Sequence, residues 1–344
     1  MFDATPLLEK LFAKEHLSQS QAFSLFNSIM HGEQPEPVLA SILTALKLNG
    51  ESPNEIAGAA SAMVSNALPF PTPDYPFADI VGTGGDGHNT INISSAAGVV
   101  AAACGVKVAK HGNRSVSSKS GSADLFRQFG VKLEITPQTA RACLDNANFC
   151  FLFAPVYHAG MRFAAPVRAA MKTRTLFNIL GPLANPASPT HGLFGVYSPE
   201  LLEPYARTLM LLGQHRAMIV HGDGLDELAL HGESVILDLE HGDIRKRTVT
   251  TKDFGLPTYP LSEIEGGEPD ENRKMVEAAL GGQGKEAHRA AIAMNCAALL
   301  KLTDTVDSFK EGAEMAMNAM ENALPLEVLT KVARISQQEP DNNA

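Results

Sequence analysis

The first 70 or so residues carry apolar side chains at helical spacing and show no alternating strand pattern. Two runs each mark one face of a helix: Leu7, Leu8, Leu11 and Phe12, then Phe23, Phe26, Ile29 and Met30. Two further helices are predicted over 38–48, closed by Gly50, and over 54–66, opened by Pro53. The pattern predicts a small all-helical domain over residues 1–70.

Beyond this domain the pattern changes. Four prolines between positions 69 and 76 predict a stiff, extended connection. Short apolar runs then alternate with helical patterns, which favours a buried, mainly parallel sheet in a larger α/β domain over 77–344. Strands are predicted over 79–81, 106–109, 149–153, 193–196 and 217–221, with a hairpin over 233–239 and 244–250. Helices are predicted over 95–104, 122–129, 137–146, 199–212, 272–280 and 285–301.

One helical stretch, over 168–180, interrupts this alternation and is predicted to stop at Gly181-Pro182. We expect it to pack back on the N-terminal helices, so that segments near 168–186 join the helical domain.

Composition narrows the class of protein. The chain of 344 residues is 44% hydrophobic, 19% charged and has a formal net charge of −10. These values predict a globular protein of two or three domains, and the acidic balance argues against nucleic-acid binding through the global field. The four cysteines lie in apolar surroundings without CxxC spacing, which favours reduced thiols in the cytoplasm. No signal peptide is visible at the N-terminus, and the longest apolar run, 96–106, is too short to span a membrane.

The segment 79–95, DIVGTGGDGHNTINISS, is the sharpest local feature. A strand ends in four glycines within six residues, and two serines then open an Ala/Val-rich helix. Glycines let backbone N–H groups approach a ligand, and a helix N-terminus adds unpaired donors, so the segment favours phosphate. The alternative is a sharp turn followed by an ordinary serine N-cap. The segment also fits GxGxxG, but 87–123 contains no Asp or Glu, which argues against a dinucleotide-binding fold.

A second segment, 110–122, is rich in cations, hydroxyls and glycines. It follows a predicted strand and precedes a helix, and ligands bind α/β proteins at the carboxyl ends of such strands. A solvated basic loop is the plainer interpretation. Two anion-suited loops together nevertheless favour a ligand with several phosphate charges.

Two further segments offer candidate side chains. Asp226 and Glu227 follow a predicted strand and suit Mg²⁺ beside a polyphosphate, although such a pair alone is more often surface charge. Tyr157 and His158 are predicted at the end of another strand; beyond them Arg168 could hold a carboxylate, whereas Arg162 is expected to be a surface residue. The histidines lack zinc-ligand spacing. No nucleophile–base arrangement is apparent, and no catalytic acid or base is assigned.

With these segments in view, the chain resembles the anthranilate phosphoribosyltransferases. The resemblance covers nearly the whole chain and is strongest over 79–195 and 224–227. It rests on the following segments in this order: GTGGDG at 82–87, NISS at 92–95, KHGNRSVSS at 110–118, GSAD at 121–124, PVR at 166–168, NILGPLANP at 178–186 and GLDE at 224–227. Tyr157 stands where many members of the family have a histidine.

The resemblance implies a nucleoside phosphorylase-like fold with the site in the cleft between the two domains, and a homodimer joined through the helical domains. It implies the transfer of a phosphoribosyl group from phosphoribosyl diphosphate (PRPP) to anthranilate, with Mg²⁺ as cofactor. The residues expected to bind PRPP are Gly82, Gly85, Asp86, Thr90, Asn92, Ser94, Ser95, Lys110, Asn113, Ser118 and Ser122. Those expected at anthranilate are Gly82, His111, Asn113, His158 and Arg168, and those expected at Mg²⁺ are Ser94, Asp226 and Glu227.

Two alternatives share the implied fold. A pyrimidine nucleoside phosphorylase would use phosphate and a nucleoside, and the segments around Asn113 and Arg168 argue against it. A non-catalytic paralogue that binds nucleic acid should be basic and should lack the two loops. The net charge of −10 and both intact loops argue against that second alternative.

Overall fold

The computed structural model describes residues 2–114 and 120–338. The chain opens with four helices: α1 (Thr5–Phe12), α2 (Gln19–Met30), α3 (Glu36–Asn49) and α4 (Pro53–Ser65). Two of them begin with capping boxes. Ser18 and Gln21 exchange bonds at the start of α2, and Ser52 and Glu55 do so at the start of α4.

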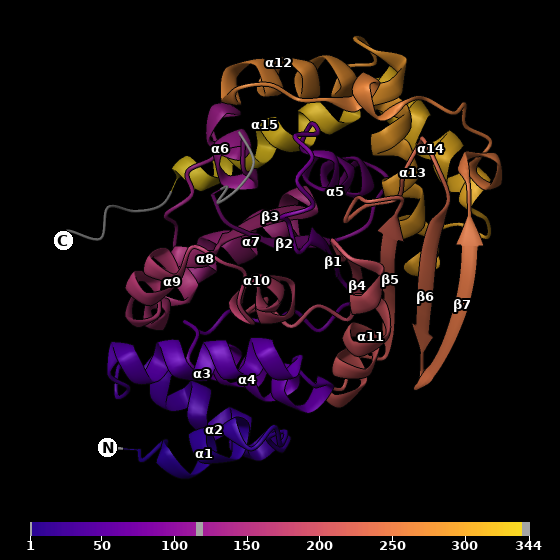
Figure 1. Cartoon of the computed structure of the whole chain (residues 1–344). Coiled ribbons are helices and arrows are strands. Elements are labelled where there is room, and N and C mark those ends of the chain that lie inside the picture. Colours follow the sequence, from indigo (N-terminus) through magenta and orange to yellow (C-terminus); the bar gives the residue numbers. More distant parts are fainter. Residues whose placement is uncertain (1, 115–119, 339–344) are drawn as a thin grey trace.

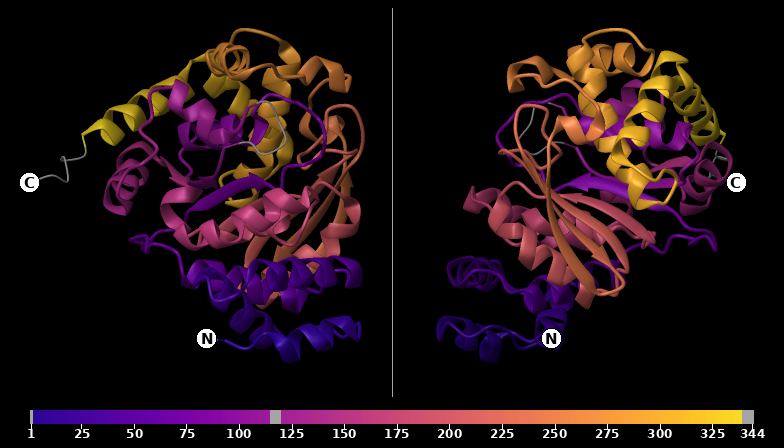
Figure 2. Two further views of the ribbon diagram at one scale, coloured as in Figure 1. Left: turned by 60° about the vertical axis from the view of Figure 1, so that its left-hand side comes forward. Right: turned by 90° about the vertical axis from the view of Figure 1, so that its right-hand side faces the viewer.

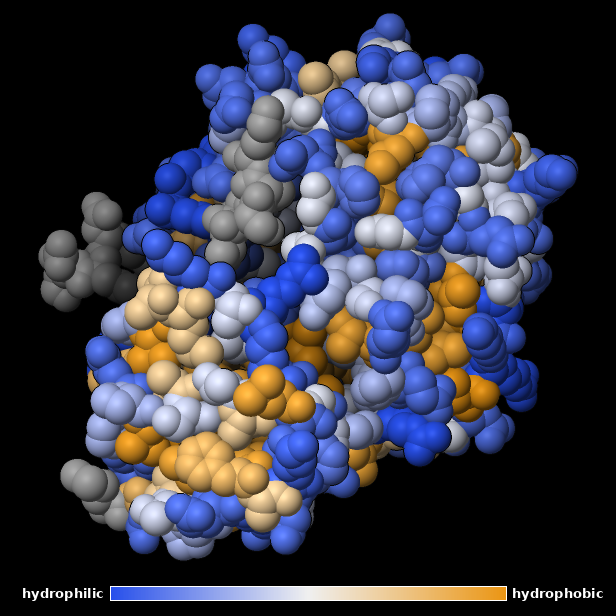
Figure 3. Space-filling view, viewed as in Figure 1, coloured by the Kyte–Doolittle hydropathy of each residue, from blue (hydrophilic) through white to orange (hydrophobic). Residues whose placement is uncertain are grey.

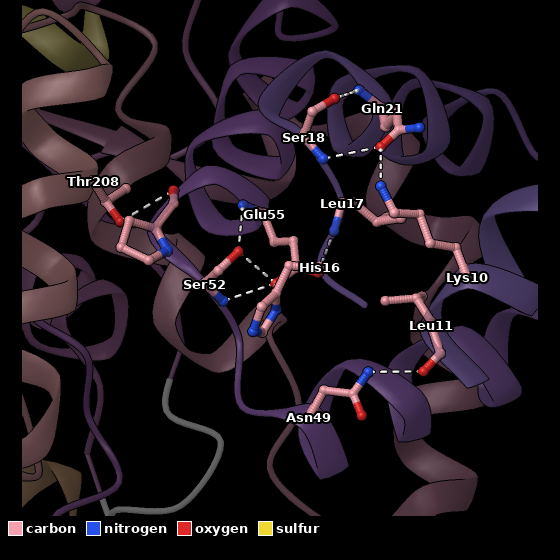
Figure 4. A network of polar contacts seen from close by, with 11 residues as sticks. Lys10, Leu11, His16, Leu17, Ser18, Gln21, Asn49, Ser52, Glu55 and Thr208 are labelled. Carbon is pink, nitrogen blue, oxygen red and sulfur yellow. Dashed lines mark hydrogen bonds and ion pairs between the residues drawn. The ribbon is translucent and has the colours of Figure 1, made fainter. Parts of the chain in front are cut away.

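The Glu55 carboxylate has a second role in holding these helices together (Figure 4). It is fully buried and accepts hydrogen bonds from the Leu17 backbone N–H at 2.9 Å and from the Ser52 hydroxyl at 2.6 Å, and it lies 3.0 Å from His16 Nδ1. One cap side chain therefore also fixes the connection between α1 and α2, which lowers the cost of burying its charge.

Two later helices, α9 (Ala165–Met171) and α10 (Phe177–Leu180), share a core with the first four. The Phe26 and Phe177 rings pack edge-on with centroids 5.6 Å apart. We call α1–α4 with α9 and α10 the helical unit. The single helix predicted over 168–180 is wrong in detail: the chain breaks at Lys172, which has a φ of 48°, and continues past Gly181 as a 3₁₀ turn, η2 (Gly181–Ala184).

Within the described residues, a seven-stranded sheet has the order β3-β2-β1-β4-β5-β6-β7. The first five strands in this order are parallel, and β6 and β7 form an antiparallel hairpin at the edge away from β3 (Figures 1 and 2). The strands are β1 (Ala78–Gly82), β2 (Val108–Gly112), β3 (Phe149–Phe153), β4 (His191–Gly195), β5 (Arg216–Gly222), β6 (Ser234–Glu240) and β7 (Asp243–Val249). The mainly parallel sheet expected from the sequence is confirmed.

Each face of the sheet packs on a different core, because successive side chains along a strand point to opposite faces. Leu193 of β4 belongs to the core made with α5 (Ile93–Ala103) and α13 (Glu286–Leu302), whereas the next residue, Phe194, belongs to the core of the helical unit and α11 (Leu202–Leu211). The sheet therefore lies between two helical layers.

The remaining helices complete these layers or connect the strands. They are α6 (Ser122–Gln128), α7 (Pro137–Ala147), α8 (Ala154–Tyr157), η1 (Ala159–Phe163), η3 (Pro199–Leu201), η4 (Thr251–Phe254), η5 (Leu261–Ile264), α12 (Pro269–Leu280), α14 (Phe309–Glu321) and α15 (Leu324–Gln337). Among the residues that the structure describes, no helix is long and apolar enough to cross a membrane.

Three differences from the predicted elements matter for the site. Strand β2 runs to Gly112 and not to 109, so Lys110 and His111 are strand residues. Helix α5 begins at Ile93, two residues earlier than predicted, which places Ser94 and Ser95 in its first turn. Tyr157 ends the short helix α8 and does not lie at the end of β3.

Candidate functional site

The three loops singled out in the sequence meet at one edge of the sheet. Strands β1, β2 and β5 run parallel, so the segments that leave their carboxyl ends lie on the same side. The Gly84 N–H donates to Asp226 Oδ2 at 2.6 Å, and the Ser94 N–H donates to Glu227 Oε1 at 2.9 Å. The loop after β1, which we call the glycine loop (residues 82–92), is therefore held directly by the acidic pair after β5.

Glycine is required where these segments touch. A Cβ at Gly82 would lie 2.1 Å from Asp226 Oδ2, and one at Gly195 would lie 1.5 Å from the Asp226 carbonyl oxygen. Further along, Gly84 and Gly85 have φ of 68° and 79°, a conformation that L side chains rarely adopt. The glycines thus serve both close packing and the path of the loop.

The acidic pair concentrates negative charge. Burial and then the nearby Asp86 carboxylate raise the pKa of Asp226 to about 7. Burial and then the Asp226 charge raise the pKa of Glu227 well above its usual range. Both shifts mean that the deprotonated forms lack sufficient compensation by cations.

These carboxylates fit Mg²⁺ by their chemistry. They are oxygen ligands whose mutual repulsion a divalent cation would relieve, and Mg²⁺ takes one or two carboxylates together with substrate phosphates. Among the described residues, no group of three or more His, Cys, Asp or Glu side chains is arranged to hold a metal by itself. The arrangement therefore suits a metal that arrives with a phosphate ligand better than a closed structural site.

Lys110 lies in the middle of β2 and is almost fully buried, with only 1% of its surface exposed. Its Nζ donates to the Ile80 carbonyl oxygen at 2.5 Å. Burial lowers the pKa of Lys110, and the charges of Asp79, Glu227 and Asp226 counteract this in that order. Its ammonium group is therefore directed to the β1 side of the site.

Asp79 is a residue that the sequence analysis missed as part of the site. Its carboxylate is fully buried on β1, and Oδ2 accepts from the Asn185 side-chain N–H at 2.8 Å. Burial raises the pKa of Asp79 to about 6, while the charge of Lys110 opposes the shift. An acidic residue three positions before the glycine loop was the available signal, because a buried strand seldom carries a carboxylate without a partner.

The second predicted loop is tied to the first by side chains. Ser95 Oγ donates to Ser122 Oγ at 2.8 Å, and Asn92 Nδ2 donates to the Ser120 carbonyl oxygen at 3.1 Å. Asn92 caps α5 by position, but its side chain makes no capping bond, so the serine N-cap alternative is wrong. The described parts of the two loops thus converge at the starts of α5 and α6.

The other PRPP candidates are distributed along these loops. Asp86 accepts from the His88 N–H at 3.0 Å. Thr90 is half-buried, and its backbone pairs with that of Glu265 in an isolated antiparallel β-bridge. Asn113 is exposed just after β2. Ser118 lies outside the described residues. Arg174, which carried no signal in the sequence, donates to the Gly85 carbonyl oxygen and stacks 4.1 Å from the centroid of Tyr197.

Two histidines lie where β2 faces the helical unit. His111 and His158 are buried, with their rings 5.1 Å apart and edge-on. His111 Nδ1 is 3.1 Å from the Gly181 carbonyl oxygen, and His158 Nε2 is 2.9 Å from that of Ala184. Burial lowers the pKa of both histidines, that of His111 to about 3, so neutral rings donate to these carbonyls. His111 Nε2 has no partner among the described residues.

Arg168 differs clearly from Arg162. Arg162 is exposed and lies over the Phe163 ring, as expected for a surface residue. Arg168 is half-buried over the Phe177 ring, and burial lowers its pKa. Within the described ranges no carboxylate lies within ion-pair distance of Arg168. A partly desolvated guanidinium without a carboxylate partner is suited to bind one from a ligand.

Two hollows on the described surface differ in their relation to the site. One, of about 270 Å³, borders the glycine loop and is lined by Gly87, His88, Asn89, Thr90, Leu261, Glu265 and Gly266. The larger, of about 320 Å³, lies by the α6–α7 connection and contains none of the predicted site residues. In Figure 3, hydrophilic side chains predominate over α12 and α6, whereas apolar ones reach the surface over α9 and the helices below it.

The protein combines a helical bundle with a mainly parallel α/β domain, and two anion-suited loops lie at one edge of the sheet. Known proteins of one class share this arrangement. The glycosyl transferase family matches twice, by its helical bundle domain over residues 5–67 and by its a/b domain over 74–324. The anthranilate phosphoribosyltransferase of Tolumonas auensis is 57% identical, over 97% of this chain and the full length of that protein. The chain belongs to the anthranilate phosphoribosyltransferase family.

Solved structures agree with this assignment. The anthranilate phosphoribosyltransferase of Thermus thermophilus superimposes with a TM-score of 0.91 at 39% identity, covering 96% of this chain and 99% of that one. The enzyme of Saccharomyces cerevisiae in complex with PRPP and Mg gives a TM-score of 0.90 at 29% identity, covering 98% and 99%. Its complex with 4-fluoroanthranilate gives 0.86 at 27% identity, covering 96% of each chain.

Proposed function

We propose that this chain transfers the phosphoribosyl group from 5-phosphoribosyl 1-diphosphate to the amine of anthranilate, in tryptophan biosynthesis. The products are N-(5-phosphoribosyl)anthranilate and pyrophosphate. The observation that carries the proposal is the meeting of the glycine loop, Lys110 and the Asp226-Glu227 pair at one sheet edge. The yeast complexes with PRPP and Mg and with 4-fluoroanthranilate support both substrates and the metal.

In this reaction the amine nitrogen forms a bond to the anomeric carbon of the sugar. The bond from that carbon to the diphosphate oxygen breaks, its electron pair leaves with pyrophosphate, and the amine loses a proton. The loop N–H groups and Lys110 stabilise the departing negative charge. Asp226, Glu227 and Ser94 would hold Mg²⁺, which when bound would supply further positive charge there.

The proposed site residues fall into two sets. Gly82, Gly85, Asp86, Thr90, Asn92, Ser94, Ser95, Lys110, Asn113, Ser118 and Ser122 bind PRPP. Gly82, His111, Asn113, His158 and Arg168 line the anthranilate site, where Arg168 orients the substrate carboxylate. An aromatic amine is neutral at pH 7 and already nucleophilic. The protein's main task is therefore to position the two substrates, and no general base is assigned.

The proposal extends to the organisation of the protein. Residues 1–70, with segments near 168–186, act as the helical domain, and 77–344 act as the PRPP-binding domain. We expect a cytoplasmic homodimer joined through the helical domains, which sedimentation analysis would test.

The deciding experiment follows anthranilate fluorescence after PRPP is added to the protein, with and without Mg²⁺. A Mg²⁺-dependent loss of fluorescence is expected. If folded protein gives no loss, anthranilate is not the acceptor. Release of free base from thymidine and phosphate would instead indicate a nucleoside phosphorylase, and salt-sensitive binding of single-stranded DNA would indicate a nucleic-acid-binding protein.

A further inference from the structure

A buried asparagine on α12 contacts both loops of the PRPP site. Asn272 is only 1% exposed. Its Nδ2 donates to Asn92 Oδ1 and to Ser120 Oγ, the latter at 3.3 Å. These partners lie 180 and 152 residues away in the sequence, at the ends of the two loops. One amide group from a distant helix therefore reaches both.

The three residues form a closed set of contacts. Asn92 Nδ2 donates to the Ser120 carbonyl oxygen at 3.1 Å, and Ser120 Oγ donates to Asn92 Oδ1 at 3.3 Å. Asn92 immediately precedes α5, and Ser120 lies just before α6. Asn272 thus binds the point at which the loops come together.

The orientation of the Asn272 amide is fixed by these partners. Its Oδ1 is buried and has no hydrogen-bond partner among the described residues. Reversing the amide would place this oxygen against the Asn92 oxygen, where two acceptors repel. A buried acceptor without a partner destabilises the fold. The two hydrogen bonds that Nδ2 donates must therefore stabilise this orientation by more than the unpaired Oδ1 destabilises it.

Backbone contacts from the segment before α12 brace the same loop. The Ile91 N–H donates to the Ile264 carbonyl oxygen at 3.1 Å, and the Gly266 N–H donates to the Asn89 carbonyl oxygen at 2.7 Å. A Cβ at Gly266 would lie 2.8 Å from the Thr90 oxygen and 2.9 Å from Asn272 Oδ1. The segment leading into α12 is therefore packed against the glycine loop without room for a side chain.

From these contacts we propose that Asn272 is a positioning residue for PRPP. It holds the Asn92 side chain in one orientation and keeps the ends of the two loops at a fixed separation. This inference rests on the proposed function, because it concerns how that site is held ready for its ligand. Asn272 acts through Asn92 and Ser120 and need not touch the substrate itself.

The first test compares N272A and N272D. The alanine variant loses the donor, and its KM for PRPP should rise about three- to tenfold, the usual effect of losing one net hydrogen bond, with the KM for anthranilate unchanged. The aspartate variant keeps the shape but sets a carboxylate against Asn92 Oδ1, so its KM for PRPP should rise further. An unchanged KM for PRPP, or equal rises for both substrates, would overturn the proposal.

A matched control separates positioning from general destabilisation. Ser336 is fully buried on α15, donates to the Ala333 carbonyl oxygen and accepts from the Lys132 N–H, and none of these residues belongs to either loop. S336A should lower the melting temperature as N272A does while leaving the KM for PRPP unchanged. If S336A also raises that KM, the N272A effect reflects stability, and the proposal fails.

A double-mutant cycle with N92A tests the route of the effect. If Asn272 acts through Asn92, N272A should add little to the KM of N92A, whereas independent residues would give additive losses. Calorimetric binding of PRPP with Mg²⁺ in the absence of anthranilate repeats the test without turnover. If wild type binds PRPP but does not consume anthranilate when it is added, the proposed acceptor is refuted, and the binding affinities of the variants for PRPP alone then decide this inference.

Discussion

Two buried charge centres lie at the same sheet edge, and they are balanced in opposite ways. At the first, the Lys110 ammonium group has the Asp79 carboxylate as its main opposite charge. At the second, burial and then nearby carboxylates raise the pKa of both groups: Asp86 acts on Asp226, and Asp226 and Asp86 act on Glu227. The first centre pairs opposite charges, whereas the second brings like charges together.

This difference shows which of the two centres has opposite charges without any bound ligand. Opposite charges inside a protein offset part of the cost of leaving water, but adjacent like charges add to it. The Lys110–Asp79 centre can be permanent. The Asp226–Glu227 centre is relieved by a bound cation or by a proton, and a cation is what the proposed function would supply beside PRPP.

The largest loss of activity is expected from E227Q, which removes one carboxylate charge from the Asp226–Glu227 pair. Glutamine still accepts from the Ser94 N–H, so the loop is kept while one charge of the proposed Mg²⁺ site is lost. We expect the rate to fall about 100-fold and the half-saturating Mg²⁺ concentration to rise, since metal and electrostatic stabilisation act on the departing group. Steady-state rates across a Mg²⁺ titration provide the measurement.

The matched control is D223N. Asp223 lies in the same segment, but its side chain is 60% exposed and faces His231. Its loss should leave the rate and the Mg²⁺ dependence unchanged. A similar loss of activity in both variants would show that net charge matters and not the position of Glu227.

The first centre is broken by K110M, which keeps an unbranched chain but removes the ammonium group. We expect kcat/KM for PRPP to fall about 30-fold, within the range for hydrogen bonds to charged groups. The KM for anthranilate should change little. Equal effects on both substrates would contradict a role for Lys110 at the diphosphate.

D79N removes the negative charge beside Lys110 and leaves the lysine itself in place. The pKa of Asp79 is raised in the folded protein from 3.8 to about 6, so its contribution to stability is lost as pH rises through this range. The shift corresponds to about 3 kcal/mol. In urea unfolding, wild type should therefore lose about 3 kcal/mol relative to D79N between pH 4 and pH 7.

Parallel pH profiles of the two proteins would contradict this account. A second measurement concerns Lys110, because D79N removes the largest influence that keeps it charged. We expect kcat/KM for PRPP to fall at pH 8, by less than in K110M, because the loss of the Asp79 charge lowers the pKa of Lys110 further.

The smallest expected effect lies outside both centres. R168A should raise the KM for anthranilate roughly fivefold and leave that for PRPP unchanged, because a half-buried Arg–carboxylate contact contributes about 1 kcal/mol. R162A, which removes the exposed neighbour over Phe163, is the control. An unchanged KM in R168A would exclude the role as a carboxylate clamp.

Local features of the amino-acid sequence predicted most of the secondary-structure elements and the loops of the candidate site. The glycine loop, the apolar strands and the acidic pair were recognisable because each depends on a few adjacent residues. The ends of β2 and α5 were misplaced, because apolar periodicity does not show that Lys110 is buried within a strand or that Ser94 lies in the first turn of a helix. The helices over 309–321 and 324–337 also went unpredicted.

The class of fold, the two anion-suited loops and the order of the segments could be predicted from the amino-acid sequence, since these follow from backbone propensities and side-chain chemistry at short range. Only the tertiary structure placed Asp79 beside Lys110 and brought Asn272 to Asn92 and Ser120. The physical reason is that burial and pairing of charges depend on contacts between residues far apart in the chain, and a linear pattern does not encode which distant groups will meet.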